Sequence, residues 1–175
     1  MMIDVYVANI ERYLSSAAHD GVWVSFPAKP SVLNKTLDEI GVGVADEYFT
    51  PAAESGELDG LASVIGEYES LGQINALARA LVLLDENDLQ KVEAILDLES
   101  PSLPQLMMIL EVLDDYDFCP DIHTDEDLGR YCVDELGALN VPDHLRNYID
   151  YEAYGRDIRL ESSGGFAAGG FLFTP

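Results

Sequence analysis

Residues 70–84 read SLGQINALARALVLL, and this stretch decides how the middle of the chain folds. Ser70 followed by Gln73 has the spacing of a capping box, in which the two side chains satisfy backbone groups at the start of a helix. Beyond the cap, apolar residues recur at the spacing of one helical face: Ile74, Leu77, Leu81 and Leu84. The stretch therefore predicts an amphipathic helix.

The same signals recur twice toward the C-terminus. Asn87 with Gln90, and Ser102 with Gln105, repeat the cap spacing. Each pair precedes an apolar helical face, formed first by Leu89, Val92, Ile95 and Leu96 and then by Leu106, Met107, Leu110 and Leu113. We therefore predict a helical central domain, residues 67–113, with acidic turns between three short helices.

Toward the N-terminus the pattern changes to a mixture of strands and helices. Apolar residues alternate with other residues over 3–8 and again over 22–26, which is typical of half-buried strands. Ser31 is the expected N-cap of a helix that ends at Ile40, with Gly41 just beyond it. An extended piece over 47–50 precedes a loop. These elements predict a mixed α/β domain over residues 1–66.

The C-terminal third, residues 114–175, is also predicted to be mixed α/β. Thr124 with Asp127 has the spacing to open a helix that runs to Leu136 and ends at Gly137. The other expected elements are a helix from Pro142 to Ile149, a strand over 157–161 and a hairpin in the glycine-rich tail over 164–173. The fold class is therefore α+β, in three small domains.

Composition limits the classes of function. The chain has 33 Asp and Glu against 9 Lys and Arg, a formal net charge of -24, and 48% hydrophobic residues, enough to fold. Nine scattered basic residues cannot form a phosphate-binding surface, so neither nucleic acid nor an anionic membrane is an expected partner. No signal peptide or membrane span is evident, which predicts a soluble, cytoplasmic protein.

A metal site is not expected. Asp115, Asp117 and Asp121 begin like a calcium loop, but Cys119 and Pro120 stand where a ligand and the turn glycine are needed. The three histidines lie far apart in the sequence: His19, His123 and His144. No cofactor is predicted either, because the motif at residues 41–43 lacks the third glycine of a dinucleotide loop.

Enzyme chemistry has little support in the residues. No G-x-S-x-G nucleophile elbow exists, and a glycosidase-like pair cannot be singled out among so many carboxylates. Cys119 and Cys132 are predicted to be reduced packing residues. We therefore predict that the protein is not an enzyme, with a hydrolase that uses paired carboxylates as the weakest alternative.

The distribution of charge is the main functional signal. Residues 80–129 contain 14 acidic residues and one basic residue, Lys91, and the acids gather at turns while the apolar positions keep helical register. A solvated acidic face, or adaptation to high salt, is the ordinary interpretation. Duplex DNA, however, carries one charge per about 1.7 Å, so 24 charges correspond to roughly 41 Å, or about 12 base pairs. An acidic protein with this charge could occupy another protein's DNA channel.

Short segments along the chain resemble the ArdA-type antirestriction proteins of conjugative plasmids and transposons. The matching segments, in the order of the family, are MIDVYVAN (2–9), IGEYESL (65–71), EDLGRY (126–131), VDE (133–135), NYIDYE (147–152) and GRDIRLE (155–161). The resemblance implies an elongated three-domain α+β protein that forms a homodimer through its C-terminal domain and mimics duplex DNA. It also implies the target, type I restriction-modification enzymes, whose methyltransferase and specificity subunits form the DNA-binding groove.

The resemblance assigns candidate residues. Residues 128–137 correspond to the family's antirestriction motif, with a structural or dimer-forming role. The candidate phosphate-mimicking carboxylates are Glu67, Glu69, Asp85, Glu86, Asp88, Asp97, Glu99, Glu111, Asp114, Asp115, Asp117, Asp121, Asp125, Glu126, Asp127, Asp134 and Glu135. The candidate dimer-interface residues are Tyr131, Val133, Leu136, Tyr148 and Tyr151. The alternative function is that of an acidic regulatory protein that binds another basic DNA-binding protein, or of a halophile-type acidic protein.

Overall fold

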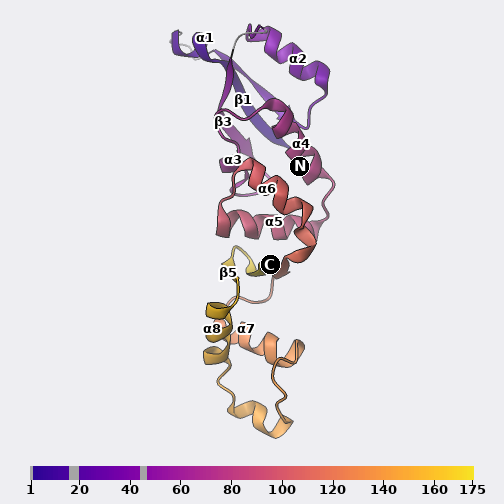
Figure 1. The fold of residues 1–175 in the computed structure, drawn as a ribbon, viewed down its shortest axis with the longest axis vertical. Coiled ribbons are helices and arrows are strands. Elements are labelled where there is room, and N and C mark those ends of the chain that lie inside the picture. The colour runs from indigo at the N-terminus through magenta and orange to yellow at the C-terminus, as the bar shows by residue number, and fades with distance from the viewer. Residues whose placement is uncertain (1, 16–19, 44–46) are drawn as a thin grey trace. The chain divides into compact units, whose positions relative to one another are not determined.

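The computed structural model describes residues 2–15, 20–43 and 47–175, so His19 lies outside the described residues (Figure 1). The chain separates into two compact units. Unit 1 comprises Met1–Leu89 and Ser100–Glu111, and unit 2 comprises Gln90–Glu99 and Val112–Pro175. Helices and small antiparallel sheets occur in the same chain, which confirms the α+β class. The division into three domains stays a prediction.

Unit 1 contains a three-stranded antiparallel sheet with β1 (Ile3–Asn9) between β2 (Gly21–Phe26) and β3 (Tyr48–Ser55). Both strands predicted near the N-terminus are confirmed, and alternate side chains of β1 are fully buried. The predicted extended piece at 47–50 was too short, because the expected loop continues the strand as far as Ser55, which pairs with Ile3. β3 lies at the edge of the sheet and has one solvent-exposed face, which is why Ala52 and Glu54 can be part of the strand.

Four helices of unit 1 surround this sheet: α1 (Ile10–Ser15), α2 (Pro30–Glu39), α3 (Leu61–Val64) and α4 (Leu71–Val82). The predicted Ser31 cap of α2 was wrong. The helix starts two residues earlier with Lys29 as N-cap, because Pro30 fits the first helical turn. Gly41, with φ of 71°, follows α2 as expected. Neither α1 nor α3 was predicted.

The cap that opens α4 is confirmed, because the Ser70 hydroxyl accepts a hydrogen bond from the Gln73 backbone N–H at 3.1 Å. The helix ends at Val82, so Leu84 is not part of its apolar face. A buried polar residue on α4, Asn75, holds the chain that follows β2. Its side chain accepts from the Ala28 N–H at 2.8 Å and donates to the Ala28 carbonyl at 3.1 Å.

The other two central helices are α5 (Glu86–Glu99) and α6 (Leu103–Glu111). The predicted Asn87 cap was wrong, because α5 begins two residues earlier. Asp85 caps it by accepting from the Asp88 N–H at 3.0 Å. The Ser102–Gln105 contact is confirmed, since Gln105 Oε1 accepts from the Ser102 N–H at 2.9 Å. Among the described residues, no helix is long and apolar enough to cross a membrane.

Unit 2 contains a second antiparallel sheet, with β6 (Gly170–Phe173) between β4 (Asp117–Cys119) and β5 (Gly164–Ala167). The hairpin formed by β5 and β6 was predicted, whereas β4 was not. Ile122, Leu128, Cys132 and Phe171 form the buried core beside this sheet. The predicted packing role of Cys132 is thereby confirmed, and both cysteines are free thiols.

The remaining elements of unit 2 are η1 (Leu113–Asp115), α7 (Asp125–Arg130), the π-helix η2 (Tyr131–Glu135), the 3-10 helix η3 (Asp143–Tyr148) and α8 (Tyr151–Glu161). The Thr124–Asp127 capping box is confirmed at the start of α7. The helix predicted over 142–149 is a shorter 3-10 helix. The strand predicted over 157–161 was wrong, because α8 starts at a cap formed by Asp150 and continues to Glu161.

Two glycines allow α7 and α8 to pack closely, side by side (Figure 1). A Cβ at Gly129 would lie 2.0 Å from the Tyr151 carbonyl oxygen, and one at Gly155 would lie 1.8 Å from the Asp125 carbonyl oxygen. Both distances are well inside van der Waals contact, so neither position can hold a side chain while the two helices keep this spacing.

Candidate acidic interaction surface

The candidate carboxylates occur in both units, and none of them is buried. Unit 1 carries Glu67, Glu69, Asp85, Glu86, Asp88 and Glu111. Unit 2 carries Asp97, Glu99, Asp114, Asp115, Asp117, Asp121, Asp125, Glu126, Asp127, Asp134 and Glu135. Four are half-buried, namely Glu69, Asp88, Asp125 and Asp127, and the others are exposed. Unit 1 has 16 acidic and 4 basic residues and unit 2 has 17 and 5, so each has a net charge of −12.

Several of these carboxylates accept hydrogen bonds from the backbone. Asp85 caps α5, and Asp97 accepts from the Ala168 N–H at 2.8 Å. Asp127 Oδ2 accepts from the Thr124 hydroxyl at 2.7 Å and from the Thr124 and His123 N–H groups at 3.0 and 3.2 Å. The Thr124 hydroxyl, followed by the two N–H groups, lowers the pKa of Asp127. These carboxylates stabilise the fold as well as adding negative charge.

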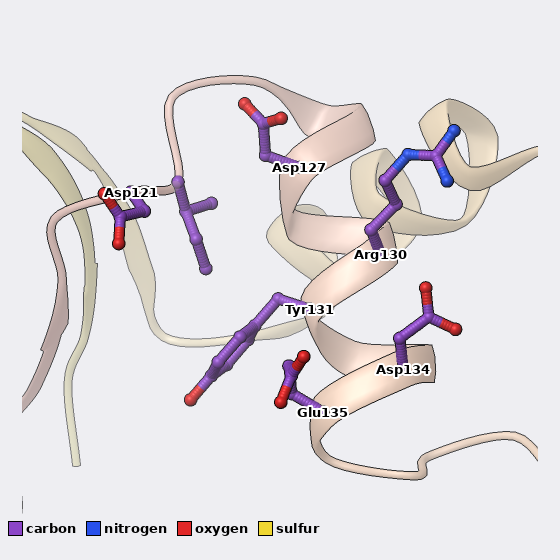
Figure 2. A pocket seen from close by; sticks show the side chains of 7 residues that line it. Asp121, Asp127, Arg130, Tyr131, Asp134 and Glu135 are labelled. Carbon is purple, nitrogen blue, oxygen red and sulfur yellow. The ribbon is translucent and has the colours of Figure 1, made fainter.

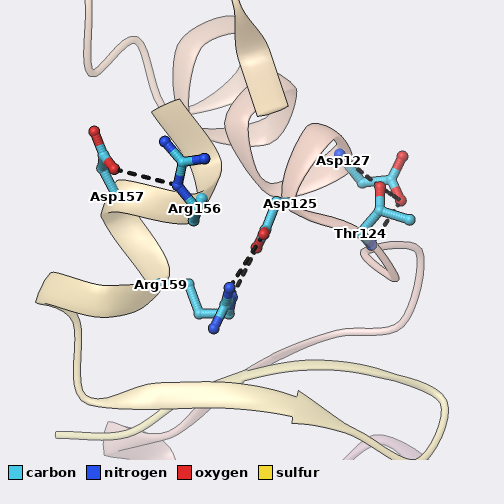
Figure 3. Close-up of polar contacts among 6 residues, drawn as sticks. All are labelled: Thr124, Asp125, Asp127, Arg156, Asp157 and Arg159. Carbon is cyan, nitrogen blue, oxygen red and sulfur yellow. Dashed lines mark hydrogen bonds and ion pairs between the residues drawn. The ribbon is translucent and has the colours of Figure 1, made fainter. Parts of the chain in front are cut away.

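Asp125 forms the most enclosed ion pair among the described residues, with Arg159 of α8 (Figure 3). Arg159 Nε donates to Asp125 Oδ1 at 2.7 Å, and Nη2 donates to Oδ2 at 3.1 Å. The Asp125 side chain is 21% exposed and the Arg159 side chain 33%. The hydrogen bond from Arg159 and its positive charge lower the pKa of Asp125, so the carboxylate is ionised and neutralised locally.

Two other candidates have arginine partners at more exposed positions. Glu126 accepts from Arg130 of the same helix at 2.7 Å, and Asp134 pairs with Arg146. The Arg130 guanidinium also lies 4.4 Å from the centre of the Tyr151 ring. The spacing of Glu126 and Arg130 by four residues is a signal for this pair that the sequence analysis missed. Nothing local in the sequence indicates the Asp125–Arg159 pair.

The connection from α6 to α7 presents four other carboxylates to solvent: Asp114, Asp115, Asp117 and Asp121. In the described part of the chain, no side-chain hydrogen bond or ion pair engages them. Buried side chains alternate with them and hold the segment in place: Leu113, Tyr116 and Ile122. Asp117 also pairs through its backbone with Phe173 in the sheet. These carboxylates are therefore exposed on a well-anchored stretch of backbone.

A pocket of about 500 Å³ lies beside α7 and η2 (Figure 2). Its lining residues are Asp121, Ile122, Asp127, Arg130, Tyr131, Asp134 and Glu135. A hydrogen bond with Cys119, together with burial, raises the pKa of Tyr131 to about 12, so the phenol is neutral at physiological pH. Four carboxylates against one arginine give the lining a net negative charge, which suits cationic groups.

The described residues contain no cluster suited to metal binding and no cysteine activated for nucleophilic attack. No group of three or more His, Cys, Asp or Glu there could hold a metal ion. Burial raises the pKa of the Cys132 thiol and also that of Cys119, which disfavours the nucleophilic thiolate. What the described arrangement can do is present negative charge to a basic partner.

The candidate dimer residues separate into two groups. Val133 and Tyr151 are buried within unit 2, and Tyr131 is half-buried. Tyr148 and Leu136 are 85% and 59% exposed. The sequence analysis missed two exposed leucines in the same stretch, Leu139 and Leu145. An exposed apolar stretch therefore connects η2 with α8.

Comparison with protein-family models gives a match to the family described as antirestriction protein (ArdA), over residues 5–173. No curated protein matches the sequence. The match covers nearly the whole chain and confirms the resemblance seen in the short segments. It implies an antirestriction function and interaction with restriction-modification enzymes. The chain therefore belongs to the ArdA family of antirestriction proteins.

Proposed function

We propose that this protein mimics duplex DNA and occupies the DNA-binding groove of type I restriction-modification enzymes, in contact with the methyltransferase and specificity subunits. It acts in the cytoplasm and is not an enzyme. The observation that carries the proposal is the exposed negative charge of both units, each with a net charge of −12. Lys and Arg that line a DNA groove would contact these carboxylates as they contact phosphates.

The carboxylates have different roles in this proposal. Those without a side-chain partner among the described residues, such as Asp114 and Asp115, are available to the basic groups of the enzyme. Those with an arginine partner, such as Asp125, add little net charge and hold the fold. Binding then depends on the summed potential of many exposed groups and on no single one.

A competition assay tests the proposal. A purified type I methyltransferase is mixed with labelled duplex DNA and increasing amounts of this protein at several salt concentrations. The protein is expected to displace the duplex, and its binding should weaken steeply with salt, because exposed charges are screened beyond about 8 Å at physiological ionic strength. Stable binding of both ligands at once would contradict the proposal. Equally tight binding to an unrelated basic nucleoid protein would favour a general acidic regulator.

Amide substitutions test how the activity is distributed. Asp115→Asn alone should cost about 0.2–1 kcal/mol of binding free energy, the range for one exposed ion pair. Combining it with Asp114→Asn, Asp117→Asn and Asp121→Asn should add these losses. Complete loss of activity from one such substitution in a folded protein would indicate a catalytic or metal site instead.

We also propose that the protein is a homodimer through its C-terminal domain. Residues 128–175 contain 7 acidic and 4 basic residues, against 14 and 1 over 80–129, so two C-terminal domains repel each other least. Exposed Leu136 and Tyr148 offer apolar area for the contact. Light scattering of the wild type should give a dimer mass, and Leu136→Ser with Tyr148→Ser should give a monomer. A monomeric wild type at micromolar concentration would contradict this part.

A further inference from the structure

The contacts of Arg159 suggest a role that its charge alone does not give. Arg159 lies on α8 and donates two hydrogen bonds to Asp125, the first residue of α7. Its guanidinium carbon also lies 5.9 Å from the centre of the Phe166 ring on β5. One side chain therefore connects α7, α8 and the hairpin of unit 2.

The backbone of Asp125 is held at the same place. Its carbonyl oxygen packs against Gly155, one helical turn before Arg159 on α8. The side chain and the carbonyl of Asp125 are thus both held by α8, as the dashed contacts in Figure 3 show for the side chain. A bidentate pair of this kind fixes direction as well as distance.

The residues that α7 orients are part of the acidic surface. α7 carries Glu126 and Asp127, and η2 follows it directly with Asp134 and Glu135. In Figure 2 the side chains of Asp127, Asp134 and Glu135 project from one continuous helical segment. Rotation of α7 on α8 would therefore move four candidate carboxylates together.

We infer that Arg159 is a positioning residue for partner binding: it fixes α7 against α8 and so sets the placement of the carboxylates that α7 and η2 carry. The inference rests on the proposed function. The inference predicts weaker partner binding when Arg159 is removed, whereas a purely electrostatic account predicts tighter binding. If only charge mattered, removal of Arg159 would make the protein more negative and would strengthen its binding to a basic groove.

Two variants with the same charge separate these accounts. Arg159→Gln and Arg156→Gln each remove one positive charge from α8. Among the described residues, Arg156 forms an ion pair with its neighbour Asp157 at 3.7 Å, with both side chains more than half exposed. It acts on Asp125 through its charge and not through a hydrogen bond. In the competition assay, Arg156→Gln should bind as well as the wild type or up to about fivefold tighter. Arg159→Gln should bind about tenfold weaker, the factor that corresponds to roughly one lost charge-assisted hydrogen bond.

A third variant keeps the charge. Arg159→Lys retains the positive charge but loses the planar fork, so it should restore only part of the binding. Hydrogen exchange of the free variants gives a readout that does not need the enzyme. The amides of α7 should exchange faster in Arg159→Gln than in the wild type, whereas in Arg156→Gln they should exchange at the wild-type rate.

Several outcomes would overturn the inference. It would be overturned if Arg159→Gln bound as tightly as Arg156→Gln, or if Arg159→Lys bound like the wild type. It would also be overturned if the α7 amides of Arg159→Gln exchanged at the wild-type rate. Failure of the wild-type protein to displace duplex would overturn the proposed function instead. Hydrogen exchange would then still decide whether Arg159 fixes α7.

Discussion

Replacement of Gly155 by alanine is the most direct test of how unit 2 is held together. The new Cβ would lie 1.8 Å from the Asp125 carbonyl oxygen and 2.6 Å from the Gly129 nitrogen. Both are backbone atoms, so no side chain can turn aside to make room. α7 and α8 would have to separate by roughly 1.5 Å to restore van der Waals contact.

The expected loss of stability follows from this separation. Overpacking of a close contact costs about 1–3 kcal/mol. A shift of this size also breaks the Asp125–Arg159 hydrogen bonds, and bonds to charged groups are worth about 1.5–3 kcal/mol. Alanine recovers about 1 kcal/mol, because it is the better helix former. We therefore expect Gly155→Ala to lower the free energy of unfolding by about 1.5–5 kcal/mol.

Urea unfolding followed by circular dichroism measures this loss, and Gly72→Ala is the matched control. Gly72 is an exposed residue of α4, and a Cβ there would meet nothing closer than the Ser70 hydroxyl at 3.9 Å. The same substitution should therefore leave stability unchanged or raise it by up to about 1 kcal/mol. If Gly155→Ala were as stable as the wild type, the close packing of α7 on α8 would be refuted.

Three other predictions concern buried or bonded side chains. Asn75→Leu leaves the Ala28 N–H without its partner and the Ala28 carbonyl with only the long bond from Arg79 at 3.5 Å. It should cost about 1–3 kcal/mol in urea unfolding, whereas an unchanged midpoint would show that Asn75 does not hold this segment. Since the pKa of Asp127 is below its usual 3.8 in the folded state, its stabilising effect is complete above that value and is lost as the pH falls through the folded pKa. The stability difference between wild type and Asp127→Asn should therefore shrink on acidification, and a difference that grows would contradict the capping role. Burial of Cys132 should make its thiol react slowly with a disulfide reagent until urea is added, and rapid labelling in the native protein would contradict that burial.

The elements predicted correctly are those that short-range signals specify. The Ser70 cap and the apolar repeat after it define α4 within a few residues, and the Thr124–Asp127 box does the same for α7. β4 depends on a partner strand at 171–173, far along the chain, and three residues carry no periodicity of their own. The helix α8 was taken for a strand because Ile158 and Leu160 alternate with charged residues.

The candidate site was predictable to a similar degree. Acidic residues at turns between apolar repeats had to face solvent, and the structure leaves all of them at least partly exposed. Local spacing can indicate an internal partner, as it does for Glu126 and Arg130, but the Asp125–Arg159 pair was not predictable, because these residues are 34 positions apart and meet only through tertiary packing. Gly155 lies between the helix predicted to end at Ile149 and the strand predicted over 157–161, yet it is a helical residue required by the approach of Asp125.

The π-helix η2 has a consequence for changes in chain length. Leu136 N–H donates to the Tyr131 carbonyl at 3.0 Å, five residues back, where an α-helix would use four. Such a turn is equivalent to one residue inserted into an α-helix. Deletion of one residue within 131–135 would permit regular α-helical bonding and leave the following residues at nearly the same angle around the axis, because the wider turn already accommodates the extra residue. The helical phase after η2 is therefore that of an α-helix one residue shorter, so a one-residue deletion within 131–135 should be tolerated better than one within α7.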